Sequence, residues 1–350
     1  MKKELIFSGI LAVMIAVIGI AKFTLKEDIK ETKGVDVVPT MEDVITKDSS
    51  WCPTFQLVFN DLKNDIVKQD VKFDKSNTFL DNLNKEEFKE SDISSDYYYK
   101  TYGVKSIELK NKIIKGIKDK FDQKSDILNK FDFTNSSPNN YFFYSMLYRE
   151  FKYPKKFNKL DNGKFNDKYD NIKYFGIKDK DEELAKQIKV LYYNNEDDFA
   201  IKLLTTSNDE VIINKNPKGN NFREIYNNIT SKSKEYKDNE FTIDSDYFKM
   251  PYLSLNVMKE YKELEGQPIK DSEGNLIEIG TALQTIKFTL DDVGGKIKSE
   301  AGMNVAKSSI DDNKSKRYFY VDKTFAIFLK ETSKDKPYFA ARVDDIRKFQ

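Results

Sequence analysis

The sequence predicts an α+β domain, in which helices and strands are segregated rather than alternating along the chain. Three observations lead to this prediction. Apolar residues recur at helical spacing in the first third of the chain, strand patterns dominate after Pro138, and we find no internal repeat. With 350 residues and 39% hydrophobic side chains, the chain can build a substantial core. We expect a single domain over residues 51–350.

The N-terminus has the pattern of an export signal. Lys2 and Lys3 precede an uncharged run at residues 5–21. This run is long for a signal-peptide core and slightly short for an average membrane-spanning helix, so we expect residues 1–25 to be a signal peptide or a membrane anchor. The two lysines should stay inside, which places the rest of the chain outside the cytoplasm. Residues 26–50 are charged and weakly periodic, and we expect a flexible tether there.

Helices are predicted in three places. Near the start of the domain, five apolar residues recur at helical spacing: Phe55, Val58, Phe59, Leu62 and Ile66. Residues 106–122 have an apolar stripe on one side and charges on the other, as expected of an amphipathic helix. Residues 222–236 predict a third, short helix.

Strand patterns follow Pro138. Residues 140–148 form a nearly continuous aromatic and aliphatic run, typical of a strand that is covered on both faces or central in a large sheet. Residues 188–193 and 199–206 flank the turn "NNEDD" and predict a hairpin. Residues 246–255 predict another strand, in which Pro251 indicates either a position at the edge of a sheet or a β-bulge. Further strands are predicted at 283–290, 318–331 and 337–345.

Composition excludes several classes of function. The 59 basic and 58 acidic side chains nearly cancel, and no basic cluster stands alone, so a nucleic-acid partner is not expected. The chain has no histidine, which removes Ser-His-Asp and Cys-His machinery and every histidine-containing metal site. Cys52 is the only cysteine, and we interpret it as a small buried hydrophobe rather than a nucleophile. We expect no cofactor and no metal.

Acidic pairs are the remaining enzyme-like feature. They occur at 196–198, 291–292 and 311–312, but with 58 acidic residues such pairs arise by chance and usually lie in solvated turns. The stretch "VGGK" at 293–296 is not a phosphate loop, because Leu290 stands where the first glycine is required. We therefore do not expect an enzyme, and an extracytoplasmic enzyme that uses paired carboxylates is the weakest alternative.

The order of the segments resembles that of the serpin family. A helix over 106–130 leads to "NYFFYSMLYREFKYPKKF", followed by "IKVLYYNNEDDFAIKLL", "YFKMPYLSL", "LQTIKFTLDDVGGK", "YFYVDKTFAIFL" and "PYFAARVDD". In serpins a helix crosses the main sheet, and an acidic-glycine corner opens the reactive-centre loop. The resemblance covers about residues 104–350. It implies a large mixed sheet with packed helices and an exposed loop of the reactive-centre type.

The resemblance assigns roles to the residues that follow the corner. In inhibitory serpins, cleavage of the loop lets it insert into the main sheet as a new strand, and the acylated protease is distorted. Alignment on Gly294 places four further residues inward, which are Gly295, Ile297, Ser299 and Ala301, and places Lys296, Lys298 and Glu300 outward. Counting along the loop places the scissile bond among Lys307, Ser308, Ser309, Ile310 and Asp311. A bulged strand followed by a fixed polar loop stays an open alternative.

Two functions follow from the resemblance. The first is suicide inhibition of a serine or cysteine protease by a secreted monomer, or by one anchored to a bacterial membrane through residues 5–21. The second is a non-inhibitory binding module for another extracellular protein on the cell surface. Ser145 replaces the asparagine of the family, and Phe151 or Tyr153 stands near the place of its tryptophan. These departures favour the second function.

Overall fold

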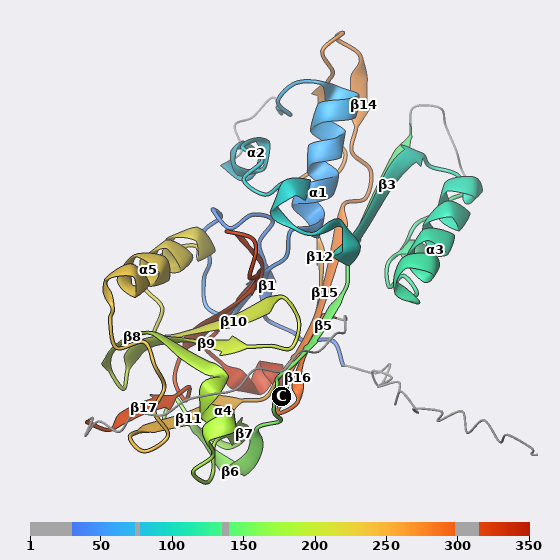
Figure 1. Ribbon diagram of the computed structural model, residues 1–350. Coiled ribbons are helices and arrows are strands. Elements are labelled where there is room, and N and C mark those ends of the chain that lie inside the picture. Colours follow the sequence, from blue (N-terminus) through green and yellow to red (C-terminus); the bar gives the residue numbers. More distant parts are fainter. Residues whose placement is uncertain (1–29, 74–77, 135–139, 298–314) are drawn as a thin grey trace, which may run out of the picture.

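The computed structural model describes four stretches of the chain, which are residues 30–73, 78–134, 140–297 and 315–350 (Figure 1). They form an α+β fold, as predicted. Within these stretches no helix is both long and apolar enough to cross a membrane. The run at residues 5–21 lies outside them, so the export signal stays a prediction.

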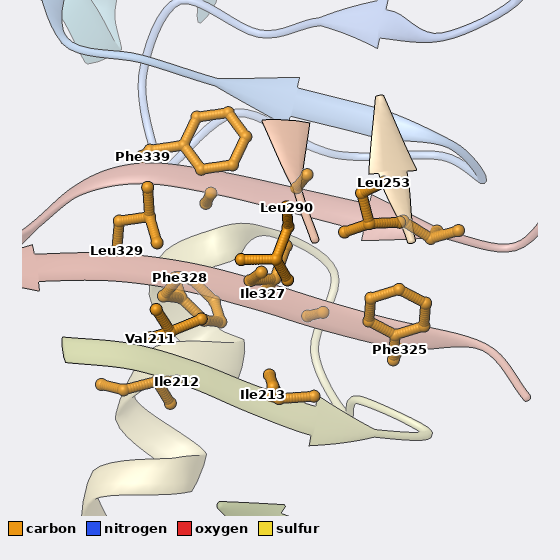
Figure 2. Packing of buried hydrophobic residues seen from close by; sticks show 14 of the residues in the cluster. Val211, Ile212, Ile213, Leu253, Leu290, Phe325, Ile327, Phe328, Leu329 and Phe339 are labelled. Atoms are coloured by element: carbon orange, nitrogen blue, oxygen red, sulfur yellow. The ribbon is translucent and has the colours of Figure 1, made fainter. Parts of the chain in front are cut away.

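A seven-stranded sheet forms the largest part of the core. Its spatial order is β1 (Asp36–Val37), β2 (Ser49–Trp51), β19 (Pro337–Val343), β18 (Phe325–Glu331), β10 (Asp209–Lys215), β9 (Asp198–Leu204) and β8 (Ile188–Asn195). The central strands are buried on both faces, because α5 packs on one side and β15 on the other. Phe328 meets Phe222 at 6.1 Å between ring centroids, and Phe339 meets Phe288 at 4.6 Å. Figure 2 shows side chains of β10 and β18 in one buried cluster with Phe339, Leu253 and Leu290.

Two smaller sheets lie at the ends of the fold. A four-stranded sheet has the order β17 (Arg317–Tyr320), β11 (Asp246–Pro251), β7 (Tyr169–Gly176) and β6 (Asn158–Phe165), and only the β11–β17 pair is parallel. A short hairpin joins β13 (Pro268–Lys270) to β14 (Leu276–Glu278).

The sheet that carries the candidate site is divided. One part has the order β12 (Leu253–Glu260), β15 (Leu283–Leu290), β16 (Gly294–Ile297) and β5 (Arg149–Lys152). The other part is the antiparallel pair of β3 (Tyr98–Val104) and β4 (Tyr141–Leu147), and β4 leads into β5 through Tyr148. In Figure 1 the β12–β15 pair and β3 diverge from the region of β5 and β16 toward the top of the view.

Helices cover these sheets. The longer ones are α1 (Thr54–Asp61), which continues as a π-helical segment η1 (Leu62–Val67), α3 (Ile107–Phe121) and α5 (Phe222–Glu235). Ser106 caps α3 by accepting a hydrogen bond from the Leu109 amide at 3.2 Å, and Asp122 ends it in the left-handed region. The short ones are α2 (Thr78–Asn84), α4 (Glu182–Lys186) and the 3₁₀ turns Glu90–Asp92, Ser95–Tyr97, Leu128–Lys130 and Ile346–Phe349.

Most predicted elements are confirmed. The three helices, the hairpin at β8 and β9, and the strand at 283–290 lie where the periodicity places them. The strand predicted at 246–255 is instead two, because Pro251 ends β11 and β12 begins two residues later in another sheet. The strand predicted at 318–331 is likewise divided between β17 and β18 of different sheets. Strands β6 and β7 were not predicted because polar residues interrupt their alternation, and β10 was not predicted because all seven of its residues are buried, so that its two faces do not alternate.

The alternative of a central strand at 140–148 is wrong, because β4 has β3 on one edge and no strand on the other within the described chain. The other alternative, a strand covered on both faces, fits: Phe142 and Tyr144 pack with α3, and Phe143 packs with the cluster of α1. The tether expected at 26–50 is wrong from Asp36 onward. Val37, Val38 and Met41 are buried, and β1 and β2 complete the edge of the seven-stranded sheet. Strands of two and three residues are too short to produce a periodic sequence signal.

Candidate functional site

The corner at residues 291–294 reverses the chain within one turn. Asp291 accepts hydrogen bonds through Oδ1 from the amides of Val293, at 2.8 Å, and Gly294, at 3.1 Å. The Asp291 amide donates to the Gly294 carbonyl at 2.8 Å. An aspartate that bonds to the backbone two residues ahead is a strong turn former. The acidic residue therefore sets the point at which β15 ends and β16 begins.

Asp292 fastens this corner to the rest of the fold. The Tyr252 hydroxyl donates to Oδ1 at 2.7 Å, and Lys156 Nζ lies 3.0 Å from Oδ2. The Phe157 amide donates to the Asp292 carbonyl at 2.8 Å. Burial raises the pKa of Asp292, but the hydrogen bonds from Tyr252 and Lys156 outweigh it, so that the pKa is lowered overall. Asp292 therefore remains charged, and the corner is held by an ionic contact.

Strand β16 lies between β15 and β5. Gly294 faces Lys152 and Ile297 faces Arg149 on β5, while Lys296 and Gly295 face Thr289 and Leu290 on β15. Both pairings are antiparallel. The stretch that directly follows the corner is therefore already a strand of the four-stranded sheet of β12, β15, β16 and β5, which is called the main sheet below.

The two glycines are required by close packing. A Cβ atom on Gly294 would lie 2.2 Å from the Phe151 carbonyl oxygen, and one on Gly295 would lie 2.2 Å from Cζ of the Phe151 ring. Phe151 is buried and belongs to the main core. Position 295 thus faces the core, whereas Lys296 pairs with Glu150 at 2.9 Å on the more exposed side. Only residues without a side chain fit between β5 and β15 at this point.

Beyond β16 the main sheet is open. Within the described residues, β15 pairs on this side only at Thr289 and Leu290, so that residues 283–288 have an unpaired edge. This edge and β4 line one cavity of 170 Å³, with Phe55 and Val58 of α1 lining it as well. A second cavity, of 380 Å³, shares Phe55 and Val58 and is lined by residues 140–143 and 279–283. The two edges thus border a slot over α1.

A buried polar group without a hydrogen-bond partner lines this slot. The Ser145 hydroxyl, on β4, is buried and has no hydrogen-bond partner among the described residues. A buried donor without a partner costs free energy, which a strand entering the slot could recover.

Comparisons with known proteins agree on this architecture. Maspin superimposes with a TM-score of 0.54 at 13% sequence identity, over 85% of this chain and 92% of maspin. Serine protease inhibitor (serpin)-12 of Manduca sexta gives a TM-score of 0.50 at 12% identity, over 86% of this chain and 93% of that protein. The chain has the serpin fold. No model of a known protein family matches the sequence, and no curated protein matches it in sequence.

Only part of the predicted site lies within the described chain. Gly294, Gly295 and the backbone of Ile297 lie in β16, where the resemblance places the start of the reactive-centre loop. The other hinge residues, Ser299 and Ala301, lie outside the described residues. So do all the residues of the predicted scissile region, which are Lys307, Ser308, Ser309, Ile310 and Asp311. The roles of these residues stay predictions.

The acidic pairs have structural contacts. Asp197 pairs with Lys215 at 3.0 Å and with Lys323 at 2.8 Å, and Asp198 pairs with Lys232 at 3.2 Å. The pKa of Asp197 is lowered, chiefly by the hydrogen bond from Lys323. Asp291 and Asp292 form the corner described above. The third pair, at 311–312, lies outside the described residues.

Sequence reasoning missed a buried ionic cluster next to β16. Arg149, fully buried on β5, lies 2.7 Å from Asp209 and 2.9 Å from Glu331, and its guanidinium stacks 3.6 Å from the Tyr97 ring centroid. Tyr338 donates to Asp209 at 2.7 Å. The cluster joins the main sheet to β10 and β18 at the position that faces Ile297.

Arginine usage could have revealed this position. The chain has 59 basic residues, yet its arginines are few: Arg149, Arg223, Arg317, Arg342 and Arg347. Arginine suits buried ion pairs better than lysine does, because its planar group makes several fixed hydrogen bonds and is weakly hydrated. In a chain this rich in lysine, an arginine is therefore a candidate for a buried ion pair, which holds for Arg149 and Arg317 but not for Arg347, whose side chain is 60% exposed.

Proposed function

We propose that the protein is a protease inhibitor of the serpin type, in which the segment between β16 and β17 is the bait for the protease. The observation that supports this proposal most directly is the slot. Within the described residues, β4 and residues 283–288 of β15 each have an edge without a strand partner, both line the same cavity, and β16 already lies at one end between β15 and β5. An edge strand of this kind readily accepts another strand.

The register supports the same proposal. If the pairing of Leu290 with Gly295 and of Thr289 with Lys296 continued along β15, residue 302 would face Leu283. The predicted inward residues Ile297, Ser299 and Ala301 would then follow Gly295 on the core side. Each new backbone hydrogen bond would contribute about 1 kcal/mol net. After cleavage, such pairing provides a driving force for insertion.

The test uses the full chain in mild detergent with a panel of serine and cysteine proteases. We expect an SDS-resistant complex with the target protease. We also expect a melting temperature at least about 10 °C higher in chains cleaved within residues 303–316, because several hydrogen bonds are added. Cleavage in that interval without a complex and without stabilisation would refute inhibition.

The second candidate function is a binding module that does not inhibit. Two buried hydroxyl groups near the site, those of Ser145 and Tyr153, lack a hydrogen-bond partner among the described residues, and both stand at positions where the sequence departs from the family. Departures from the family at the place where the strand would insert favour a role that does not require insertion. Retained protein binding by cleaved chains that show no stabilisation would support this function.

We also propose that the protein acts outside the cytoplasm. The support is the uncharged run at residues 5–21 behind two lysines. N-terminal sequencing of the protein from membrane and secreted fractions distinguishes an anchor from a cleaved signal peptide. Recovery of the uncleaved chain from the cytosol would contradict export.

A further inference from the structure

The larger of the two cavities that border the slot has the size and the walls of a small-molecule site. Its volume is 380 Å³, within the range of roughly 300–1,000 Å³ that such sites occupy. Several of its walls are apolar side chains that pack against the cluster of α1 but are themselves only partly buried. They are Val58 of α1, Ile66 of η1, Phe143 of β4, and Ile277 and Ile279 in and after β14. A ligand with an apolar chain would cover the surface that these side chains leave exposed.

A rare type of helix forms part of one wall. Segment η1 is π-helical, and the Lys68 amide that ends it donates to the carbonyl of Lys63, five residues back, at 2.7 Å. Such turns are uncommon and occur frequently at functional sites. Leu62 and Ile66 of η1 both line the cavity. The irregular helix and the cavity therefore coincide, which favours a binding role for this part of the fold.

The charged residues of the lining favour an anion. Lys105 and Lys130 line the cavity, and within the described chain neither amino group lies within 4.0 Å of a carboxylate. The Lys105 amide donates to the carbonyl of Asn140, another lining residue, at 2.7 Å, which fixes this part of the lining. Asp132 also lines the cavity, but its Oδ1 already accepts hydrogen bonds from the Thr134 amide at 2.8 Å and the Thr134 hydroxyl at 2.6 Å. Two lysines against one aspartate give the lining a net positive charge, and both amino groups can bind a carboxylate.

We propose that this cavity binds a straight-chain carboxylate, a fatty acid of medium length, with its chain against α1 and η1 and its carboxylate at Lys105 and Lys130. Leu283 lines both this cavity and the smaller one, and by the register of β15 it would face residue 302 of an inserted segment. The bound chain would therefore obstruct insertion beyond that residue. This effect on insertion rests on the proposed function, whereas the binding itself does not.

The first test measures binding of dodecanoate to the full chain by equilibrium dialysis. The chain is kept in digitonin, which has no alkyl chain that could fill the cavity, and digitonin alone corrects for uptake by micelles. We expect one saturable site per chain. The affinity should rise about threefold to fourfold for each CH₂ group from octanoate to dodecanoate, because each added group is buried. The dodecyltrimethylammonium cation, which has the same chain, should bind at least about tenfold more weakly. No saturable binding above that of digitonin alone, or equal binding of the cation, would overturn the proposal.

Variants of the lining locate the site. Val58→Trp fills the cavity from α1 and should abolish saturable binding of dodecanoate. Lys105→Met combined with Lys130→Met should weaken decanoate binding about fivefold to tenfold, as expected for the loss of two partly exposed ionic contacts. Binding of 1-decanol, which has the same chain without the charge, should change less than about twofold in this double variant. Lys234→Met is the matched control, because Lys234 is exposed on α5 and does not line the cavity. An unchanged decanoate affinity in the double lysine variant would overturn the proposal even if Val58→Trp does not fold.

The last test addresses insertion. A protease that cuts within residues 303–316 is added with and without dodecanoate, and hydrogen exchange is followed at residues 283–288, whose amides become protected only when a strand pairs with them. We expect dodecanoate to slow this protection at least about threefold in the wild type and to have less effect in the double lysine variant. Equal rates with and without bound dodecanoate would refute the effect on insertion. If the cleaved wild type gains neither protection nor stability without dodecanoate, the proposed function fails, and this failure is distinguishable because the dialysis test does not depend on insertion.

Discussion

Replacing Gly294 by alanine tests the packing of β16 directly. The added Cβ would lie 2.2 Å from the Phe151 carbonyl oxygen and 2.7 Å from Lys152 Cα, which are both backbone atoms. Contacts under 3.0 Å are essentially never adopted by real Cβ atoms, and backbone cannot rotate away as a flexible side chain can. The two strands must therefore separate by nearly an ångström, which breaks hydrogen bonds that require about 2.7–3.2 Å between nitrogen and oxygen.

The cost is limited by the free energy that holds β16 in the sheet. Four residues of β16 pair with β5. Loss of two to four backbone hydrogen bonds, at about 1 kcal/mol each, predicts a loss of about 2–4 kcal/mol. Gly295→Ala should cost about 1–3 kcal/mol, because its clash is with the buried Phe151 ring, which must repack. Gly280→Ala is the control, because nothing lies within 4 Å of a Cβ at that position.

Urea unfolding and amide exchange measure this effect. We expect lower unfolding free energies for Gly294→Ala and Gly295→Ala, and faster exchange at residues 294–297 and 149–152. Gly280→Ala should match the wild type or be slightly more stable, by up to about 1 kcal/mol. An unfolding free energy for Gly294→Ala within about 0.5 kcal/mol of wild type, with unchanged exchange at β16, would refute the packing argument.

Three further predictions concern buried groups. Burial raises the pKa of the Cys52 thiol to about 11, so a thiol reagent at pH 8 should label it only after unfolding; rapid labelling of the native chain would contradict this burial. Arg149→Met should lower the unfolding free energy by about 3–5 kcal/mol, because Asp209 and Glu331 lose their shared cation; a loss below about 1 kcal/mol in urea unfolding would count against the cluster. The lowered pKa of Asp292 means that its contribution to stability is present above its unfolded pKa, about 3.9, and is lost as the pH falls through the lower folded pKa. The difference in unfolding free energy between wild type and Asp292→Asn should therefore be constant near neutrality and shrink on acidification, and a difference that is independent of pH would contradict this assignment.

The two aspartates of the corner, Asp291 and Asp292, show how local sequence and tertiary contacts differ in what they determine. The stretch "DDVGG" predicts a turn from residue types alone, and Asp291 makes that turn by bonding to the next amides. Its neighbour Asp292 has the same side chain but a different role, because Tyr252 and Lys156 approach it from other parts of the fold. No local pattern distinguishes the two residues.

The sequence by itself determined the α+β class, the three amphipathic helices, the hairpin of β8 and β9 and the corner before β16. Each depends on local periodicity or turn chemistry, which acts between residues close in the chain. It also implied the serpin fold through the order of its segments. Only the tertiary structure decided that β4 has no strand on one edge within the described chain, that residues 36–51 complete a sheet, and that Arg149 and Arg317 are buried with carboxylates. Strand partners and buried ion pairs join residues far apart in the chain, so their energies depend on neighbours that local sequence does not specify.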